Sequence, residues 1–293
     1  MKDSLKIEKI VFATDLLENS RLALDYAVAF AEHFGASILM LHVVQLSGAA
    51  HAAELEIHHA SVSRLAAEER LDVLASGVRR LGLSVETEVV DGLTCEKILQ
   101  AVDRHKADLL VVGVHGVHRG VEHLLIGSNT EKIMLSAKCP ILTVGAHVLT
   151  GFDIKRHVKE ILLFSDFTRE STSAAPYALM LGHEFGLPVD VCQLLPVVAE
   201  GNERLRKELA EDYCQSVKGV LGDEDAAWCQ PTFQLERGMQ LEQIVDRAKS
   251  QHAGLIILGA HTESLVGRHL HTSFAYQVLG RATCPVFTIP RLP

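Results

Sequence analysis

Short apolar runs alternate along this chain with longer segments of helical periodicity. The run IVFATD at residues 10–15 precedes a segment that ends at Gly35, and glycine is the residue that most often ends a helix. Inside that segment, apolar or ring-bearing side chains recur at helical spacing at Leu22, Tyr26, Ala29, Phe30 and His33. The pattern predicts a strand followed by a helix.

The same order continues through the first half of the chain. The apolar run SILMLHVV at 37–44 precedes a long charged helix predicted over 53–82, whose mixed Glu and Arg positions predict a solvated face. The segment SVETEVV at 84–90 alternates with period two, as an edge strand does. After a further helical segment, the run DLLVVG at 108–113 is apolar on both faces, which is typical of a strand buried between two helix layers. Strands that alternate with helices predict a parallel sheet with right-handed crossovers.

The whole pattern occurs twice. Three pairs of residues align at one constant offset: Asp15 with Asp166, Tyr26 with Tyr177 and Gly35 with Gly186. Later, ADLLVVGVH aligns with AGLIILGAH, and SAKCPILTVGA aligns with RATCPVFTIPR. A repeat of this length indicates two tandem domains of the same fold. Because the chain is polar and poorly periodic around Thr150, we predict one domain over 1–148 and a second over 156–293.

Composition excludes several classes of partner. The chain of 293 residues is 48% hydrophobic and has a formal net charge of −9, without any long Lys/Arg run. Nucleic acid is not expected as a partner, because phosphate neutralisation needs clustered cations. No apolar stretch approaches the roughly 20 residues that span a bilayer, and the start MKDSLKIEKIVFATD has no signal-peptide pattern. We therefore expect a cytoplasmic protein that does not enter a membrane.

A glycine-containing stretch follows the predicted strand at 108–113. It reads GVHGVHRGVEHLLIGSNTEKI, and its glycines are Gly113, Gly116, Gly120 and Gly127. In an open parallel sheet, ligands bind at the carboxyl ends of strands, and glycine lets the backbone approach a ligand at positive φ. At the far end, Ser128 to Glu131 read S-x-x-E, the signature of a capped helix start. A helix N-terminus favours phosphate, and His118, Arg119 and His123 could add positive charge. The alternative is that the glycines only form a tight turn and Ser128 only caps.

With these motifs in place, the chain resembles the universal stress protein family, as a tandem two-domain member. The strand IVFATD, the strand ending LHVV, the stretch GVHG…GS and the strand CPILTV carry the resemblance, which covers nearly the whole chain twice. It implies in each half a doubly wound, five-stranded parallel sheet in the order 3-2-1-4-5, the adenine nucleotide alpha-hydrolase-like fold. The nucleotide-binding branch of the family carries G-x2-G-x9-G-[ST], whose backbone holds the phosphates of ATP.

The resemblance assigns a role to individual residues of the first half. Those matching the phosphate motif are Gly113, Gly116, Gly127 and Ser128, with Asn129 next. Asp15 matches an acidic residue near the ribose and base, Val43 an adenine-side contact, and Ala13 a position where members often have proline. The implied ligand is ATP, with or without magnesium. We therefore expect ATP or a related adenine nucleotide in the N-terminal domain, in a stress-response switch that acts on an unknown protein partner.

Two departures bear on this expectation. Ten residues separate Gly116 from Gly127 where the family pattern has nine. The second copy keeps nine but reads GAHTESLVGRHLHTS, with Thr262 and Thr272 in place of glycines. Because these side chains intrude on a backbone cradle, we expect the C-terminal domain to bind ATP weakly or not at all.

Other kinds of chemistry have weaker support in the sequence. Histidines at His58, His59, His261, His269 and His271 lack an HxxxH motif with a partnering carboxylate, so no metal site is expected. No G-x-S-x-G elbow is present, and six cysteines without a CxxC pair fit reduced, mostly buried thiols. The sequence identifies no dedicated enzyme, although slow ATP hydrolysis stays open. A nucleotide-independent scaffold of the same fold is the alternative function, and either a monomer with pseudo-dimeric halves or a homodimer fits the repeat.

Overall fold

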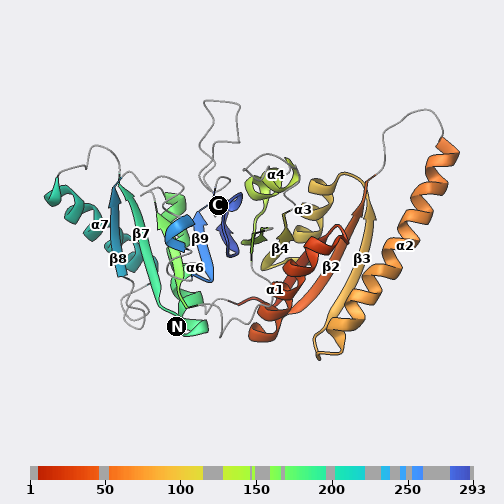
Figure 1. Cartoon of the computed structure of the whole chain (residues 1–293), viewed down its shortest axis with the longest axis horizontal. Helices are drawn as coiled ribbons and strands as arrows, with labels where there is room; N and C mark the ends of the chain where they lie inside the picture. Colours follow the sequence, from red (N-terminus) through yellow and green to blue (C-terminus); the bar gives the residue numbers. More distant parts are fainter. Residues whose placement is uncertain are drawn as a thin grey trace. The chain divides into compact units, whose positions relative to one another are not determined.

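The computed structural model describes residues 6–45, 53–114, 128–145, 147–148, 159–165, 169–195, 202–221, 232–237, 245–248, 253–259 and 278–290. The described residues divide into two compact units. One holds residues 6–114 and 128–145, and the other holds those after residue 146 (Figure 1). Each unit contains five strands.

The first unit alternates strands and helices. Its strands are β1 (Lys9–Thr14), β2 (Ser37–Val44), β3 (Val85–Asp91), β4 (Leu109–Gly113) and β5 (Ile141–Val144). Its helices are α1 (Glu18–Phe34), α2 (Ala53–Arg79), α3 (Thr94–His105) and α4 (Ser128–Ser136). The strand order is β3-β2-β1-β4-β5 and every pairing is parallel. This confirms the predicted order 3-2-1-4-5.

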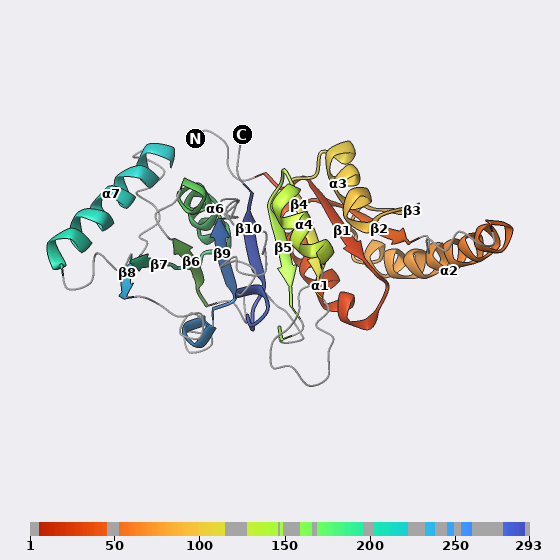
Figure 2. The same ribbon diagram turned by 90° about the horizontal axis from the view of Figure 1, so that it is seen from above.

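Helices cover both faces of this sheet. Helix α1 packs on β1, β2 and β4, while α2 packs on β2 and β3. Helix α3 contacts β1, β2 and α4, and Figure 2 shows α3 on the opposite side of the sheet from α1 and α2. Between the two layers, Ile10, Val11, Phe12, Leu109 and Leu110 are fully buried. The continuous apolar runs therefore become the two-sided core that their composition predicts.

Local sequence features set the ends of these elements. Gly35 ends α1 with φ 68°, and its N–H donates to the carbonyl of Ala31. Strand β3, predicted as an edge strand from its alternation, does lie at the sheet edge. The solvated face of α2 is less polar than predicted, because Val62, Leu65 and Val73 are exposed on it.

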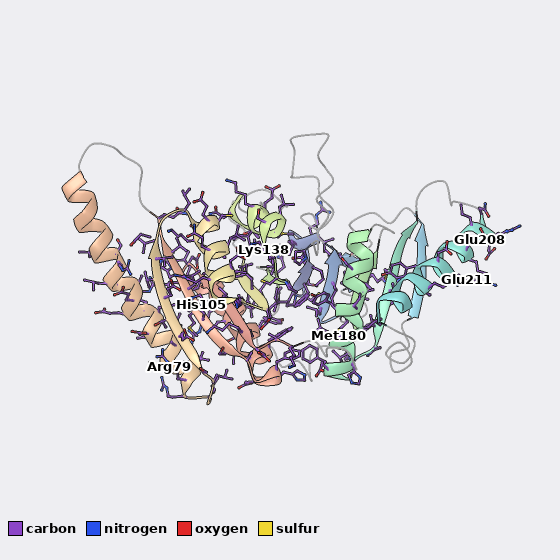
Figure 3. All side chains as sticks on the ribbon, turned by 180° about the vertical axis from the view of Figure 1, so that it is seen from behind. Arg79, His105, Lys138, Met180, Glu208 and Glu211 are labelled. Carbon is purple, nitrogen blue, oxygen red and sulfur yellow. The ribbon has the colours of Figure 1, made fainter. Side chains whose placement is uncertain are left out.

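The second unit repeats the topology. Its elements are β6 (Ile161–Ser165), α6 (Arg169–Phe185), β7 (Val189–Leu195), α7 (Glu203–Leu221), β8 (Thr232–Arg237), β9 (Leu255–Gly259) and β10 (Val286–Ile289). The strands lie in the order β8-β7-β6-β9-β10, and all pairings are parallel. Helix α7 carries the charged face expected of a solvated helix. Arg204 pairs with Glu208 at 2.9 Å, and Figure 3 shows Glu208 and Glu211 projecting from this helix.

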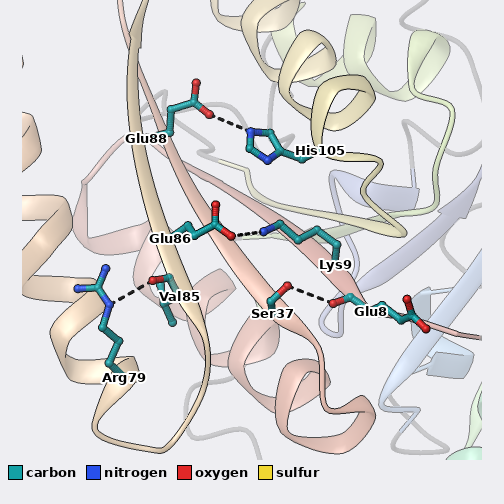
Figure 4. Close-up of polar contacts among 8 residues, drawn as sticks. All are labelled: Glu8, Lys9, Ser37, Arg79, Val85, Glu86, Glu88 and His105. Atoms are coloured by element: carbon teal, nitrogen blue, oxygen red, sulfur yellow. Dashed lines mark hydrogen bonds and ion pairs between the residues drawn. The ribbon is translucent and has the colours of Figure 1, made fainter.

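Polar contacts occupy the amino ends of the strands in the first unit. Lys9, at the start of β1, donates to Glu86 Oε1 of β3 at 2.7 Å. Ser37, at the start of β2, donates to the carbonyl of Glu8 at 3.2 Å (Figure 4). The hydrogen bond from Lys9 lowers the pKa of Glu86. Polar side chains at this edge thus take part in hydrogen bonds, and a cavity opens at the opposite, carboxyl edge.

Among the residues described, no helix is both long and apolar enough to cross a bilayer.

Candidate functional site

A cavity of about 380 Å³ opens at the carboxyl edge of the first sheet. Residues from β1, β2, β4, α3 and α4 and from the connections beside them line it: Ala13, Thr14, Asp15, Ser20, Leu41, His42, Val43, Gln45, Thr94, Ile98, Val112, Gly113, Asn129, Thr130 and Ile133. Strands β1 and β4 are neighbours here; α1, which follows β1, packs on the sheet, and α4, the next described helix after β4, packs against α3 on the other face (Figure 2). Such a switch point is where doubly wound sheets bind ligands.

A chain of hydrogen bonds shapes the turn between β1 and α1. The hydroxyl of Ser20 donates to the carbonyl of Leu17 at 2.7 Å, so its single hydrogen is used. Thr14 Oγ1, 2.8 Å from Ser20 Oγ, must therefore donate to it. Thr14 Oγ1 also accepts from the N–H of Leu16 at 3.0 Å. Asp15 Oδ1 accepts from the N–H of Leu17 at 2.9 Å, so the turn itself orients this carboxylate.

The end of β2 contributes a second wall. His42 Nδ1 lies 2.8 Å from the carbonyl oxygen of Thr14, which ties β2 to β1 at the point where Val43 enters the cavity lining. Two residues further on, Gln45 Nε2 donates to Thr94 Oγ1 at 2.7 Å. This bond links the end of β2 to the first residue of α3, and it gives the wall a polar rim.

Gly113 lies at the cavity for a reason that differs from the predicted one. Its φ is not positive, unlike that of Gly35. A Cβ built on Gly113 would lie 3.3 Å from Ser20 Cα and 3.5 Å from Ala23 Cβ. The residue is therefore glycine because α1 approaches the end of β4 closely. The prediction that Gly113 uses left-handed backbone freedom is wrong.

Helix α4 begins at the cavity. Its described residues run from Ser128 to Ser136. Glu131 is buried, and its Oε1 has no hydrogen-bond partner within the described part of the chain. That oxygen does not make the capping-box bond that S-x-x-E predicts. Asn129 and Thr130, in the first turn, line the cavity.

The structure brings together five of the eight predicted site residues: Ala13, Asp15, Val43, Gly113 and Asn129. Gly116 and Gly127 lie outside the described residues, as does the side chain of Ser128. The predicted cations His118, Arg119 and His123 also lie outside them.

Several cavity residues were not predicted. They are Thr14, Ser20, Leu41, His42, Gln45, Thr94, Ile98, Val112, Thr130 and Ile133. Thr14 directly precedes the predicted Asp15, and His42 directly precedes the predicted Val43. Both could have been predicted from their positions at strand ends, where ligands bind. Thr94 and Thr130 are polar residues in the first turns of α3 and α4, and that position in the sequence is the signal that could have identified them.

Asp15 is the one formally charged side chain among the described residues that line the cavity. The cavity otherwise offers hydroxyl, amide and imidazole groups, with apolar walls from Leu41, Val43 and Ile98. On this part of the lining, an anionic ligand group would be held by N–H groups at the start of α4 and not by a side-chain cation. The described residues contain no cluster of His, Cys, Asp or Glu suited to a metal ion.

Comparison with known proteins identifies relatives of each half. The sequence profile of the universal stress protein family matches residues 6–145 and again residues 157–290. A universal stress protein of Methanocaldococcus jannaschii is 31% identical over 144 residues, covering 47% of this chain and 81% of that protein. One from Thermus aquaticus is 32% identical over 136 residues, covering 46% of this chain and 96% of its own length.

A solved structure matches nearly the whole chain. A universal stress protein from Archaeoglobus fulgidus superposes with a TM-score of 0.75 at 20% identity, covering 98% of this chain and 97% of that one. At this identity the likeness concerns the fold alone.

Proposed function

Because the chain belongs to the universal stress protein family, we propose that its first unit binds ATP or a related adenine nucleotide in the cavity at the carboxyl edge. The single observation that carries this proposal is the convergence of Asp15, Val43, Gly113 and Asn129 on one cavity. Asp15 directly follows β1, Val43 lies on β2, Gly113 ends β4 and Asn129 lies in the first turn of α4. The volume of the cavity, about 380 Å³, also lies in the range of small-molecule sites.

The groups around the cavity suit the parts of a nucleotide. The Asp15 carboxylate, oriented by the N–H of Leu17, suits the hydroxyls of a ribose. The apolar wall at Leu41 and Val43 suits the base, which needs an apolar surface with a few polar contacts. The first turn of α4 suits phosphate, because its N–H groups and dipole favour anions. Magnesium, if carried, would be held by the phosphates, since Asp15 is the one carboxylate on the described lining.

In the proposed function, occupancy of this cavity acts as a switch. Binding would favour one arrangement of the surrounding loops over another, and a protein partner in the cytoplasm would recognise that arrangement. The second unit would not take part, because Thr262 and Thr272 replace the motif glycines there. One nucleotide per chain is therefore the expected stoichiometry.

The experiment is a calorimetric titration of ATP into the full chain. We expect one site, and we expect Asp15→Asn and Gly127→Val each to weaken binding at least tenfold. Asp166→Asn is the matched control, because Asp166 is the repeat equivalent of Asp15, and it should leave affinity unchanged. Unchanged affinity in both Asp15→Asn and Gly127→Val would place the ligand elsewhere.

Failure of the parent chain to bind any adenine nucleotide would favour the alternative of a nucleotide-independent scaffold. Purified protein can be denatured and the supernatant analysed for nucleotide by absorbance and mass spectrometry, which distinguishes the two functions without added ligand.

Hydrolysis of ATP requires its own test. ATP turnover above that of an Asp15→Ala variant would be needed to make this chain an enzyme.

A further inference from the structure

The turn between β1 and α1 contains a residue in an unfavourable backbone conformation. Leu16 has φ 63°, in the left-handed region that L side chains other than Asn and Asp rarely adopt. Its side chain is buried, at 7% exposure, so the conformation carries a leucine into the core next to the cavity. A local conformation of this kind persists only where surrounding contacts hold it.

One such contact comes from a distant helix. Arg70, on α2, places Nη2 2.5 Å from the carbonyl oxygen of Leu16. The other arginines of α2 for which contacts are described, and Arg80 just after the helix, bind elsewhere. Arg64 pairs with Glu68 and Asp91, Arg79 donates to Val85 O, and Arg80 donates to Ser76 O. Among these arginines Arg70 alone reaches the β1–α1 turn.

The peptide groups on both sides of Leu16 are bonded to side chains of the turn. The N–H of Leu16 donates to Thr14 Oγ1 at 3.0 Å, and the N–H of Leu17 donates to Asp15 Oδ1 at 2.9 Å. Rotation of Leu16 out of the left-handed region would turn both peptide groups. The carboxylate of Asp15, which lines the cavity, would then lose the donor that orients it.

We propose that Arg70 is a positioning residue: by holding the carbonyl of Leu16 it keeps the β1–α1 turn in its left-handed conformation, and thereby keeps Asp15 oriented toward the ligand cavity. The effect on a ligand rests on the proposed nucleotide function, whereas the effect on the turn does not. Helix α2 is thereby coupled to the cavity, although no described residue of α2 lines it.

The test compares two truncations of Leu16. Leu16→Ala and Leu16→Gly both remove the buried side chain, but only glycine adopts positive φ without cost. Arg70→Ala is then added to each, and to the parent chain. Amide hydrogen exchange at Leu17 and Ser20 without nucleotide reports the turn, and ATP titration reports the cavity.

In the Leu16→Ala background, Arg70→Ala should speed exchange at Leu17 and Ser20 and weaken ATP binding about tenfold, the size expected for a hydrogen bond from a charged donor. In the Leu16→Gly background the same change should have less than about a threefold effect, because the competent turn remains dominant without Arg70. Arg80→Ala, one residue beyond the end of α2, is the control and should change neither readout.

An equal effect of Arg70→Ala in both backgrounds, or unchanged exchange at Leu17 in the alanine background, would overturn the proposal. If the truncated variants do not fold, exchange at Leu17 in Arg70→Ala alone decides it, with faster exchange expected. If the parent chain binds no ATP, the nucleotide function fails, and the exchange measurement still decides the role of Arg70 in the turn.

Discussion

His42 Nδ1 and the carbonyl oxygen of Thr14 lie 2.8 Å apart, and their hydrogen bond joins the carboxyl ends of β2 and β1. A carbonyl oxygen only accepts, so Nδ1 must carry the proton. In the neutral imidazole the other nitrogen, Nε2, is then an acceptor. The ring lines the cavity, so its tautomer is set by the backbone before any ligand enters.

This bond predicts different outcomes for two substitutions at position 42. His42→Leu leaves the part-buried carbonyl of Thr14 without its donor, which should lower the free energy of unfolding by about 1–3 kcal/mol. His42→Asn keeps a side-chain N–H near the position of Nδ1 and should lose less than half as much. Urea denaturation of both variants is the measurement. Equal destabilisation would show that ring packing, and not the bond, holds this site.

Two glycines predict opposite effects of the same change. Gly35 ends α1 with φ 68°, and a Cβ there would meet nothing within 4 Å. Gly35→Ala should therefore destabilise by about 1 kcal/mol through backbone conformation alone. Gly77, inside α2, also has open space around a Cβ, and Gly77→Ala should stabilise by about 0.5–1 kcal/mol. Thermal unfolding of the pair checks both signs, and a shift in the same direction for both would refute the argument.

The fold could be predicted because its signals are local and repeated. Apolar residues such as those at 109–112 are buried on both faces, and β3 alternates because it lies at an edge. Each of these patterns occurs again in the second half of the chain, which strengthens the prediction. The boundaries of the two domains, 1–148 and 156–293, stay predictions. The helical face of α1 was less well predicted, since Ala23, Ala27 and Ala31 are fully buried while His33 is exposed.

The candidate site was predicted in part, because the carboxyl ends of parallel strands share one edge. Asp15, Val43 and Gly113 end or follow three strands, so strand position alone brings them together. Contacts between segments that are distant in the sequence could not be predicted in this way. Nothing near Gly113 in sequence indicates the close approach of Ser20, and nothing near Arg70 indicates that it reaches the turn after β1.

A buried ion pair in the second unit was also hidden from the sequence. Asp190 interrupts the apolar strand β7 and is fully buried, and Arg247 Nη2 donates to its Oδ2 at 2.6 Å with the arginine side chain 13% exposed. Removing one partner leaves a buried charge, so Arg247→Met should destabilise by about 3–5 kcal/mol. The double variant Asp190→Leu/Arg247→Met removes both charges and should recover most of that loss. Chemical denaturation tests this, and a double variant as unstable as Arg247→Met would contradict it.

The thiols of Cys139 and Cys284 predict a loss of stability at alkaline pH. Burial raises the pKa of each from an ordinary 9.0 to about 12. Between these values the unfolded chain releases thiol protons that the folded chain retains. Their contribution is therefore fully present below pH 9 and is lost as the pH rises toward 12. The slope is about 1.4 kcal/mol per pH unit for each thiol.

Lysines and tyrosines titrate in the same range, so the thiol contribution has to be measured as a difference. The variant Cys139→Ala/Cys284→Ala lacks both thiols and keeps every other titrating group. Between pH 8 and pH 10 the parent chain should lose about 2–3 kcal/mol more unfolding free energy than this variant, with about half the excess from each thiol. Urea denaturation at the two pH values measures it, and single variants divide it between the units. Parallel pH profiles for parent and variant would mean that water reaches these thiols in the folded protein, because only a solvated thiol keeps its ordinary pKa.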